Sequence, residues 1–308
     1  MNDSSMDGNY ENRVCGCVIC FIFISGYYFG MDKLSVLLSN FSIHAGVFFA
    51  GNICGRHEFE KDELRGHLHL IRRGPVQLFG IAPRTIEVNE PTLLFLPRPD
   101  KHRLVADESN GADVVCGTVQ FGGGGKNPIT DSLPSLMEIK ISEIAGIDSI
   151  LDHMFSEAFA NEDGRQALLD RLCEVLIIRL LRHCISQGIT AGGTLAGLGD
   201  AKLSKTLLAI QADPVRSWDL NELAETAGMS RARFAVRFRE VVGETPGEYL
   251  ASWRIMLAQR MLKNGKRLKH VVDEVGYASS SALTRAFVRK LGCSPTAWLK
   301  NQEQAPEN

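Results

Sequence analysis

Apolar residues follow two different spacings along this 308-residue chain. Between residues 45 and 121 they form short runs rich in Val, Leu, Ile and Phe, interrupted by Gly, Pro, Asn and Asp, as is typical of strands. After residue 144 they recur every three or four positions, as is typical of amphipathic helices. Many short strands joined by turns favour a sandwich or a small barrel. We therefore expect an α+β protein in which strands come first and helices follow.

The boundaries of the expected elements follow from the same pattern. The expected strands are residues 46–54, 67–72, 76–79, 84–88, 93–96, 102–105 and 114–121, and the first long helices are residues 144–159 and 165–185. The second of these helices carries an apolar stripe wide enough to pack against the sheet, against a second subunit, or against both. Its interspersed arginines argue against a membrane span. Residues 186–199, rich in Gly, Thr and Ala, are expected to be a linker.

The chain from residue 200 to residue 302 contains one pattern twice, at about residues 220–241 and 268–291. In each copy a short helix ends at a glycine, Gly228 or Gly276, where a positive φ is expected. A serine then caps the free N–H groups that begin a second helix. The capping serines are Ser230 and either Ser279 or Ser280. Each copy is a helix-turn-helix motif, so we expect an all-α domain that contains two of them.

The second helix of each motif has one buried and one outward face. Phe234 and Phe238, and likewise Leu283 and Phe287, are four residues apart and form the buried stripes. Arginine reads guanine bidentately and small apolar groups meet a thymine methyl, so the outward faces suit a DNA major groove. The residues expected to contact DNA are Arg231, Ala232, Arg233, Ala235, Val236, Arg237, Arg239, Lys266, Ser280, Ser281, Thr284, Arg285 and Arg289. Arg285, then Arg239 and Arg233, are expected to contact bases; Arg231, Arg237, Lys266 and Arg289 are expected to contact phosphates.

A third helix, expected over residues 247–262, separates the two motifs. Tyr249, Trp253 and Leu257 lie at helical spacing in it. A rigid helix of this length can hold two reading helices about 34 Å apart, which is one turn of duplex DNA. Both helices would then enter successive major grooves on one face of the DNA.

This stretch resembles the DNA-binding domain of the AraC/XylS family of transcription regulators. The matching residues are Trp218, Leu220, Leu223, Ala224, Ala227, Gly228, Met229, Ser230, Phe234, Phe238, Gly243, Pro246, Tyr249, Leu250, Arg254, Leu257, Ala258, Leu262, Val275, Gly276, Tyr277, Ser279, Arg285, Ala286, Phe287, Gly292 and Pro295. Val272 and Leu283 stand where the family usually has Ala and Phe. The resemblance implies a bacterial-type regulator that binds double-stranded operator DNA and, if it activates, RNA polymerase. The alternative is a helical bundle that merely contains two similar-looking motifs.

The distribution of charge agrees with this reading, although the net charge is only −2. Residues 200–308 carry 17 Lys+Arg against 12 Asp+Glu, whereas residues 1–199 carry 17 against 24. The basic charge is therefore concentrated in the half that contains the reading helices, as attraction to phosphate requires.

Residues 31–185 resemble a cupin-type sensor domain, because residues 31–38 resemble its opening and residues 67–74 and 93–104 the two halves of a cupin motif. The resemblance implies a β-barrel that senses an unknown small effector, a metal or a redox signal. Together with the wide apolar stripe on residues 165–185, this resemblance leaves open the alternative that residues 31–185 form a homodimer.

One set of residues in the sensor half suggests a metal: Cys54, His69, His102 and Cys116. Two thiolates and two imidazoles match a tetrahedral zinc ion. Alternatively, the cysteines pack as small apolar residues and the histidines make ordinary hydrogen bonds. A redox role for either cysteine would require a depressed thiol pKa. His67 alternates with His69 along the strand, and we expect only one of them to face inward.

The rival function is a metal-dependent cupin enzyme, such as a dioxygenase, with a helical appendage. It would use His69 and His102 with a carboxylate and an open coordination site. No glutamate follows the His-x-His pair at the spacing of such enzymes, because Arg72, Arg73 and Gly74 occupy that region. We therefore expect a regulator and no enzyme. A pure interaction protein would not explain the arginines on the reading helices.

The first 30 residues lie outside the two predicted domains and contain an apolar run. Residues 14–29 are almost wholly apolar, but these 16 residues fall short of the roughly 20 that span a bilayer. The preceding acidic residues do not fit a signal peptide. We expect translation to begin at Met31 and residues 1–30 to be an extension without function, with a membrane anchor as the alternative. The eight scattered cysteines form no disulfide framework, which favours a cytoplasmic protein.

Overall fold

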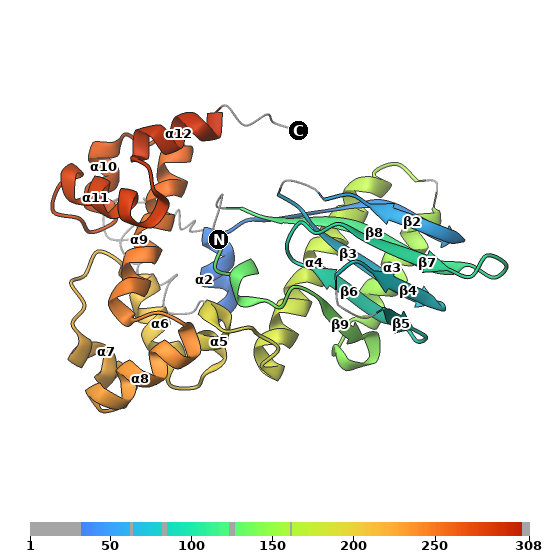
Figure 1. The fold of residues 1–308 in the computed structure, drawn as a ribbon, viewed down its shortest axis with the longest axis horizontal. Coiled ribbons are helices and arrows are strands. Elements are labelled where there is room, and N and C mark those ends of the chain that lie inside the picture. The colour runs from blue at the N-terminus through green and yellow to red at the C-terminus, as the bar shows by residue number, and fades with distance from the viewer. Residues whose placement is uncertain (1–31, 62–63, 82–84, 123–126, 161, 304–308) are drawn as a thin grey trace, which may run out of the picture.

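The computed structural model describes residues 32–61, 64–81, 85–122, 127–160 and 162–303. The predictions for residues 1–30 therefore lie outside the described residues. Strands gather at one end of the molecule and the C-terminal helices at the other, as Figure 1 shows. Apart from helix α2, Lys33–Asn40, which the sequence did not predict and which precedes the first strand, the predicted order of strands first and helices second is confirmed.

Seven of the nine strands in the described part of the chain match predicted strands. They are β1 Ile43–Ile53, β3 Gly66–Arg73, β4 Val76–Phe79, β5 Ile86–Val88, β6 Thr92–Leu96, β7 His102–Ala106 and β8 Ala112–Phe121. The two that the sequence did not predict are β2 Gly55–Phe59 and β9 Met137–Lys140. Both are short and half polar, since Arg56 and Glu58 are exposed in β2 and Glu138 and Lys140 in β9. Their pairing with neighbours, more than their own residues, makes them strands.

The strands form two antiparallel sheets in the order β1-β8-β3-β6-β9 and β2-β7-β4-β5. Alternate side chains of the larger sheet enter different cores. Ile71 and Leu94 pack in the cluster between the sheets, whereas Leu68 and Leu70 pack in the cluster that includes the helices. This explains why β3 is buried on both faces before Arg72.

Eleven helices lie within the described residues. They are α2 Lys33–Asn40, α3 Asp148–Phe159, α4 Arg165–Gln187, α5 Gly193–Gly199, α6 Leu203–Ala212, α7 Leu220–Thr226, α8 Arg231–Val242, α9 Pro246–Lys263, α10 Leu268–Glu274, α11 Ser280–Leu291 and α12 Pro295–Glu303. No helix of this part of the chain has both the length and the apolarity needed to cross a bilayer.

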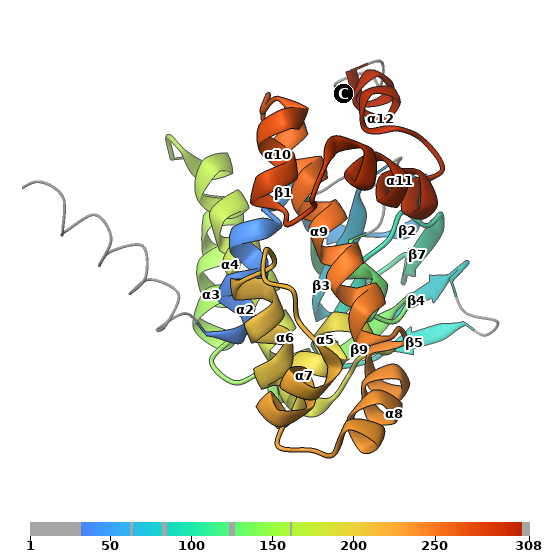
Figure 2. The ribbon, with the colours of Figure 1, turned by 90° about the vertical axis from the view of Figure 1, so that its left-hand side faces the viewer.

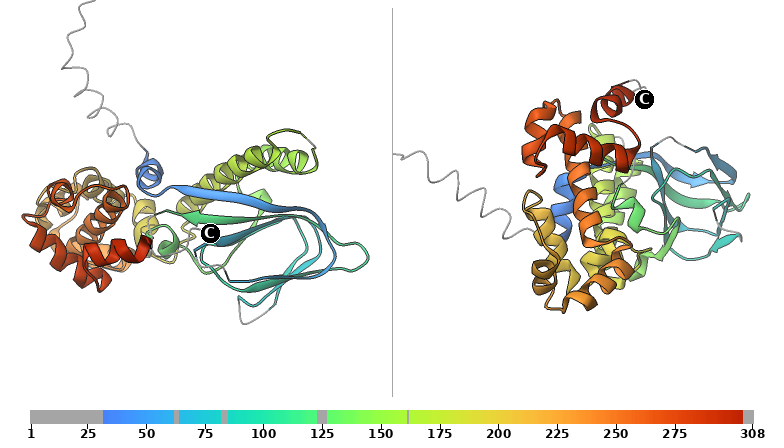
Figure 3. Two further views of the ribbon diagram at one scale, coloured as in Figure 1. Left: turned by 90° about the horizontal axis from the view of Figure 1, so that it is seen from above. Right: turned by 60° about the vertical axis from the view of Figure 1, so that its left-hand side comes forward.

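Helix α4 packs against the larger sheet, which is one of the arrangements predicted from its apolar stripe. It contacts β1, and it runs beside the strands in Figure 3. Its inner side chains Cys173, Leu176 and Leu180 are fully buried. Leu168 and Val175 on the outer side remain 47% and 43% exposed, so part of the stripe is left uncovered in the single chain.

The predicted linker contains helix α5, which is packed and not extended. Leu195 and Leu198 are fully buried, and the backbone N–H of Leu195 donates to Ser132 Oγ of the sensor half at 3.2 Å. A Cβ on Gly197 would lie 2.4 Å from the Leu207 side chain. Gly197, one of the glycines that suggested flexibility, therefore allows close packing of α5 against α6.

Three further contacts tie α2 and the residues after it to α5 and α9. Lys33 Nζ in α2 donates to the carbonyl oxygen of Leu198 at 3.0 Å, and Arg260 Nη1 in α9 donates to that of Ser39 at 3.0 Å. The ring of Phe41 also meets Trp253 of α9 edge-on at 6.0 Å. Helices α2 and α5 accordingly lie between the sheets and the C-terminal helices in Figure 1. The long connecting helix thus rests on the sensor half.

Candidate nucleic-acid interface

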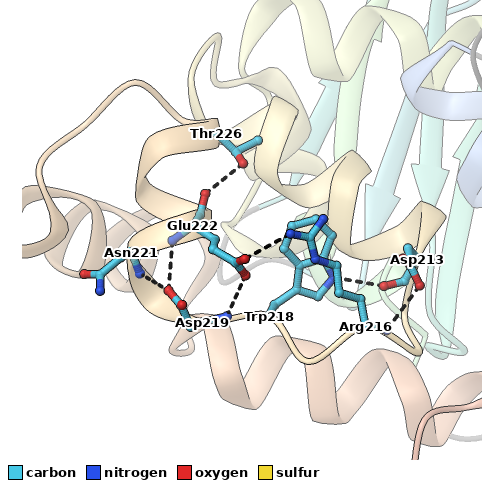
Figure 4. A network of polar contacts seen from close by, with 7 residues as sticks. All are labelled: Asp213, Arg216, Trp218, Asp219, Asn221, Glu222 and Thr226. Carbon is cyan, nitrogen blue, oxygen red and sulfur yellow. Dashed lines mark hydrogen bonds and ion pairs between the residues drawn. The ribbon is translucent and has the colours of Figure 1, made fainter.

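The first helix-turn-helix motif begins with a polar network that fixes the start of α7. The Asp219 carboxylate accepts from the N–H groups of Asn221 and Glu222 at 2.7 and 2.9 Å. Glu222 in turn accepts from the N–H of Asp219, which completes a capping box. Figure 4 shows these contacts.

The loop before α7 is held by an arginine stacked on a tryptophan. The Arg216 guanidinium lies 4.2 Å from the centre of the Trp218 ring and donates to Glu222 Oε1 at 3.0 Å. Trp218 Nε1 donates to the carbonyl oxygen of Asp213 at 2.9 Å, as Figure 4 also shows. The loop and α7 therefore form one ordered unit.

The turn of this motif has the predicted backbone but not the predicted cap. Gly228 has φ +61°, as expected for a helix-ending glycine. Ser230 occupies the N-cap position of α8, yet its side chain makes no capping hydrogen bond there. The predicted capping role of Ser230 is therefore wrong. The fully buried Phe234 and Phe238, whose rings meet edge-on at 5.5 Å, anchor α8 through the hydrophobic core.

The second motif repeats this arrangement and keeps its cap. Gly276 has φ +75°, and Ser279 Oγ accepts from the N–H of Ala282 at 3.2 Å. Leu283 and Phe287 are fully buried, as predicted. Helix α11 is thus held on one side by its core face, which leaves the opposite side outward.

Helix α9 contacts helices of both motifs, and Arg254 on it acts as a brace between them. Its guanidinium donates to the carbonyl oxygens of Pro214, Val215 and Arg216 at 2.7 to 3.3 Å. It also lies 5.6 Å from the centre of the Tyr277 ring in the second motif. The 18 residues of α9 span about 27 Å, and Figure 2 shows α8 near one end and α11 near the other.

Nearly all residues predicted to contact DNA lie on accessible surface. The exposed ones are Arg231, Ala232, Arg233, Val236, Arg237, Arg239, Lys266, Ser280, Ser281, Arg285 and Arg289, while Ala235 and Thr284 are half-buried. Val236 and Val288 are 59% and 45% exposed on the outward faces of α8 and α11. Exposed aliphatic side chains between arginines suit a surface that contacts bases.

Two of the predicted phosphate contacts are engaged within the protein. Arg237 donates twice to the Asp200 carboxylate, at 2.9 and 2.5 Å, and Lys266 Nζ lies 2.6 Å from Glu274 Oε2. Among the described residues, no ion pair involves Arg233, Arg239 or Arg285. The same holds for Arg231 and Arg289, so these five guanidinium groups are not engaged in an ion pair within the described residues.

Comparison with known proteins decides what this pair of domains is. A family model described as "Cupin" matches residues 32–186, and a "Helix-turn-helix domain" model matches residues 223–301. A putative AraC-like transcription regulator of Streptomyces lividans is 34% identical over 210 residues, covering 64% of this chain and 67% of that one. The chain belongs to the AraC-like family of transcription regulators.

Other relatives cover different shares of the molecule. An HTH-type transcriptional regulator of Haemophilus influenzae is 28% identical over 297 residues, or 88% of this chain and 98% of its own length. A solved structure of the DNA-binding domain of AdpA in complex with a target DNA is 30% identical and covers 35% of this chain and all of that one, with a TM-score of 0.33. The resemblances seen in the sequence to AraC-type and cupin domains are confirmed.

The sensor domain of this AraC-like regulator contains a buried cluster of histidines between its two sheets. His69 is fully buried, and its Nδ1 lies 3.0 Å from Cys116 Sγ. Its Nε2 lies 2.7 Å from Nε2 of His102, whose Nδ1 lies 2.9 Å from the carbonyl oxygen of Asp100. Each nitrogen of these two rings therefore has a partner within the protein.

His67 belongs to this cluster, against the prediction that it and His69 face opposite ways. The two rings are stacked, with 6.1 Å between centres and 4° between planes. Residues two apart on a strand share a face, so the alternation points both inward. Phe59 of β2, which the sequence did not single out, stacks on His102 at 5.0 Å and completes the cluster.

Cys54 does not belong to the cluster, so the predicted four-residue zinc site is wrong. Cys54 is exposed, and its Sγ lies beside Gly111, where a Cβ would be 2.8 Å away. Gly111 precedes Cys116 by five residues, so Cys54 lies roughly 16 Å from Cys116 along an extended strand. Within the described residues, no three His, Cys, Asp or Glu side chains are grouped so that they could hold a metal.

The environment of Cys116 argues against a redox-sensing role for this cysteine. Burial raises the pKa of the Cys116 thiol to about 12, so at neutral pH it is protonated and a weak nucleophile. The depressed pKa that redox sensing requires is therefore contradicted at Cys116. A direct Cys54–Cys116 disulfide is also excluded, because it needs Cα atoms within about 7 Å.

The histidine cluster predicts a loss of stability in mild acid. Burial lowers the pKa of His69 well below its usual value, with His102 and His67 adding to the effect, and burial also lowers the pKa of His102. The unfolded chain therefore binds more protons than the folded one below about pH 6.5. The stabilising contribution of the neutral rings is complete above that pH and is lost as the pH falls. We expect the free energy of unfolding, measured with urea, to fall between pH 7 and pH 5.

The matched variant is His102→Gln, which removes one titrating ring from the cluster. The pH slope reaches at most about 1.4 kcal/mol per pH unit for each extra proton bound by the unfolded chain. The variant should show a shallower slope than the wild-type protein over pH 7 to pH 5. Identical slopes would contradict the assignment of this pH dependence to the cluster.

Proposed function

We propose that this AraC-like regulator reads its operator with Arg233 and Arg239 of α8 and with Arg285 of α11. The observation that carries the proposal is the placement of two outward, arginine-bearing helix faces near opposite ends of α9. Bidentate arginine contacts to guanine would supply base recognition. Ser281 and Thr284 are suited to shorter contacts, and Arg231 and Arg289 to phosphates.

To bind DNA phosphates, Arg237 and Lys266 would have to give up the ion pairs that they make within the protein. Each already neutralises a carboxylate, that of Asp200 or Glu274. Contact with phosphate would therefore replace an ion pair instead of adding one. We place both second to Arg231 and Arg289 among the phosphate contacts.

We infer that residues 32–186 respond to a small effector and pass the response to the reading helices. Helix α5 supports this route, because it contacts Ser132 and Lys33 of the sensor half as well as α6 and α8 of the helical domain. The uncovered aliphatic side chains of α4, Leu168 and Val175, fit a homodimer. Since operator DNA of a bacterium lies in the cytoplasm, the regulator would act there, with RNA polymerase as a partner if it activates.

We infer that the sensor domain is not an enzyme. The relatives of known class are transcription regulators. In the cluster that resembles a cupin active site, both ring nitrogens of His69 and of His102 already face protein partners. The side chain of Arg72, in the region where a cupin enzyme would place a carboxylate ligand, instead lies 5.0 Å from the centre of the Phe155 ring.

Selection of bound sequences from random duplex DNA, followed by footprinting of the full chain on the selected site, tests the DNA-reading proposal. We expect each bound subunit to protect two segments about 10 base pairs apart on one face of the duplex. A single protected segment, or the absence of any enriched sequence, would contradict the use of both motifs.

A further inference from the structure

A cleft of about 430 Å³ lies where the sensor domain, residues 191–194 and the helical domain meet. Its walls include the C-terminal ends of both reading helices, residues 240–242 of α8 and 290–291 of α11, and one side of α9. The short 3₁₀ turn Thr130–Ser132 of the sensor domain contributes Asp131 and Ser132. All the parts that must communicate in a regulator therefore border one cleft.

The cleft carries a negative electrostatic bias. Apart from Asp131, which already has a partner within the protein, its charged side chains are Glu240, Glu244 and Lys290, two carboxylates against one ammonium. Lys290 is engaged within the wall, because its Nζ donates to Ser252 Oγ at 2.9 Å and lies 3.6 Å from Glu244 Oε2. The C-terminal ends of two helices add partial negative charge. Such a cleft favours a cationic ligand over an anionic one.

One polar group in the wall has no partner of its own. Gln259 on α9 is only 3% exposed and lines the cleft, and within the described residues its side-chain amide makes no hydrogen bond. Neighbouring Tyr249 is already engaged, since Gln211 Nε2 donates to its Oη at 2.7 Å. Ile255 and Met256 on the same helix provide apolar wall. Neither polar atom of this amide is among the fully buried side-chain atoms without a partner in the described residues, so the amide is open to the cleft and suited to bind a ligand.

We propose that this cleft binds a small organic cation, an ammonium group carried on an apolar body. The carboxylates and helix ends hold the ammonium group, Gln259 supplies a hydrogen bond, and Ile255 and Met256 pack against the apolar part. The volume falls within the range usual for small-molecule sites.

The regulatory consequence rests on the proposed function. A ligand in the cleft touches the ends of α8 and α11 at once, so it favours one relative orientation of the two reading helices. It thereby shifts the population of DNA-binding arrangements by its differential affinity for them.

Isothermal titration calorimetry of the full chain without DNA tests the site. The probes are phenethylammonium and hexylammonium, each compared with a carboxylate of similar shape, 3-phenylpropanoate or heptanoate. We expect the ammonium ions to bind about tenfold or more tightly than the carboxylates. Gln259→Leu should weaken ammonium binding about tenfold, and Glu240→Gln about two- to fivefold.

The control is Glu225→Gln, which removes the same charge from an exposed site in α7 outside the cleft and should leave binding unchanged. Binding of neither ammonium ion, equal or tighter binding of the carboxylates, or indifference to Gln259→Leu would each overturn the site. If the ammonium ions bind but leave operator affinity unaltered, the regulatory role falls while the DNA-reading proposal stands. Failure of that proposal is separate, because it appears as a lack of sequence-specific DNA binding with or without ligand.

Discussion

Replacing Gly276 with alanine is expected to destabilise the helical domain by about 2–5 kcal/mol and to disrupt DNA binding. Gly276 has φ +75°, which costs a non-glycine residue about 1–2 kcal/mol. The added Cβ would also lie 2.7 Å from Cα and 2.8 Å from the carbonyl oxygen of Val215. Backbone atoms cannot move away as a side chain does, so the second motif must shift relative to the first. Chemical denaturation and operator affinity measure the two effects.

Gly228→Ala is the matched control, because Gly228 is the equivalent residue of the first motif. It has φ +61°, but nothing lies within 4 Å of its added Cβ. We expect only the conformational cost, about 1–2 kcal/mol, and nearly unchanged operator affinity at a temperature where the variant is folded. Equal effects of the two substitutions would show that the contact of Gly276 with Val215 does not set the geometry of the motifs.

Arg285→Ala is expected to weaken operator binding by about 1–3 kcal/mol, or roughly 5- to 150-fold, and to relax the preference for one base pair. Arg285 is exposed on the outward face of α11, opposite the buried Leu283 and Phe287. Removal of its side chain leaves that core intact, so stability should change little. Competition binding against operators with single substitutions measures the affinity and the lost preference together.

Arg289→Ala, one turn further along α11, distinguishes base contacts from phosphate contacts. Arg289 is also exposed, and the two variants lose the same charge. As a phosphate contact it should weaken binding to all sequences alike and lower the slope of log affinity against log salt by about 1. A variant of Arg285 that behaved like Arg289→Ala, with no base preference lost, would remove Arg285 from the base-reading set.

The reading helices could be predicted because their determinants are local. The spacing of Phe234 and Phe238 fixes which face of α8 is buried, and the arginines on the other face are then exposed by default. The sensor cluster could not be predicted in the same way. Its histidines, Phe59 and Cys116 come from four strands, and β2, which contributes Phe59, has too little β character to be noticed.

Two features of the histidine cluster depend on different levels of structure. Local strand geometry sets the shared face of the histidines, and the pairing of strands sets the positions of the cysteines. That His67 and His69 share a face follows from strand geometry alone, although the sequence interpretation placed them on opposite faces. Whether Cys54 or Cys116 lies near them depends on strand register. Register places Cys116 opposite His69, whereas Cys54 lies beside Gly111, just before β8 begins.

The sequence by itself determined the two domains, both helix-turn-helix motifs and the arginine-bearing faces, because periodicity, helix-ending glycines and charge act over a few neighbouring residues. The tertiary structure alone decided that the apparent linker is a packed helix, that Gly276 meets Val215, and that the ends of α8 and α11 share a cleft with the sensor domain. These features join residues tens to more than a hundred positions apart. Such contacts depend on how whole elements pack, which no local pattern encodes.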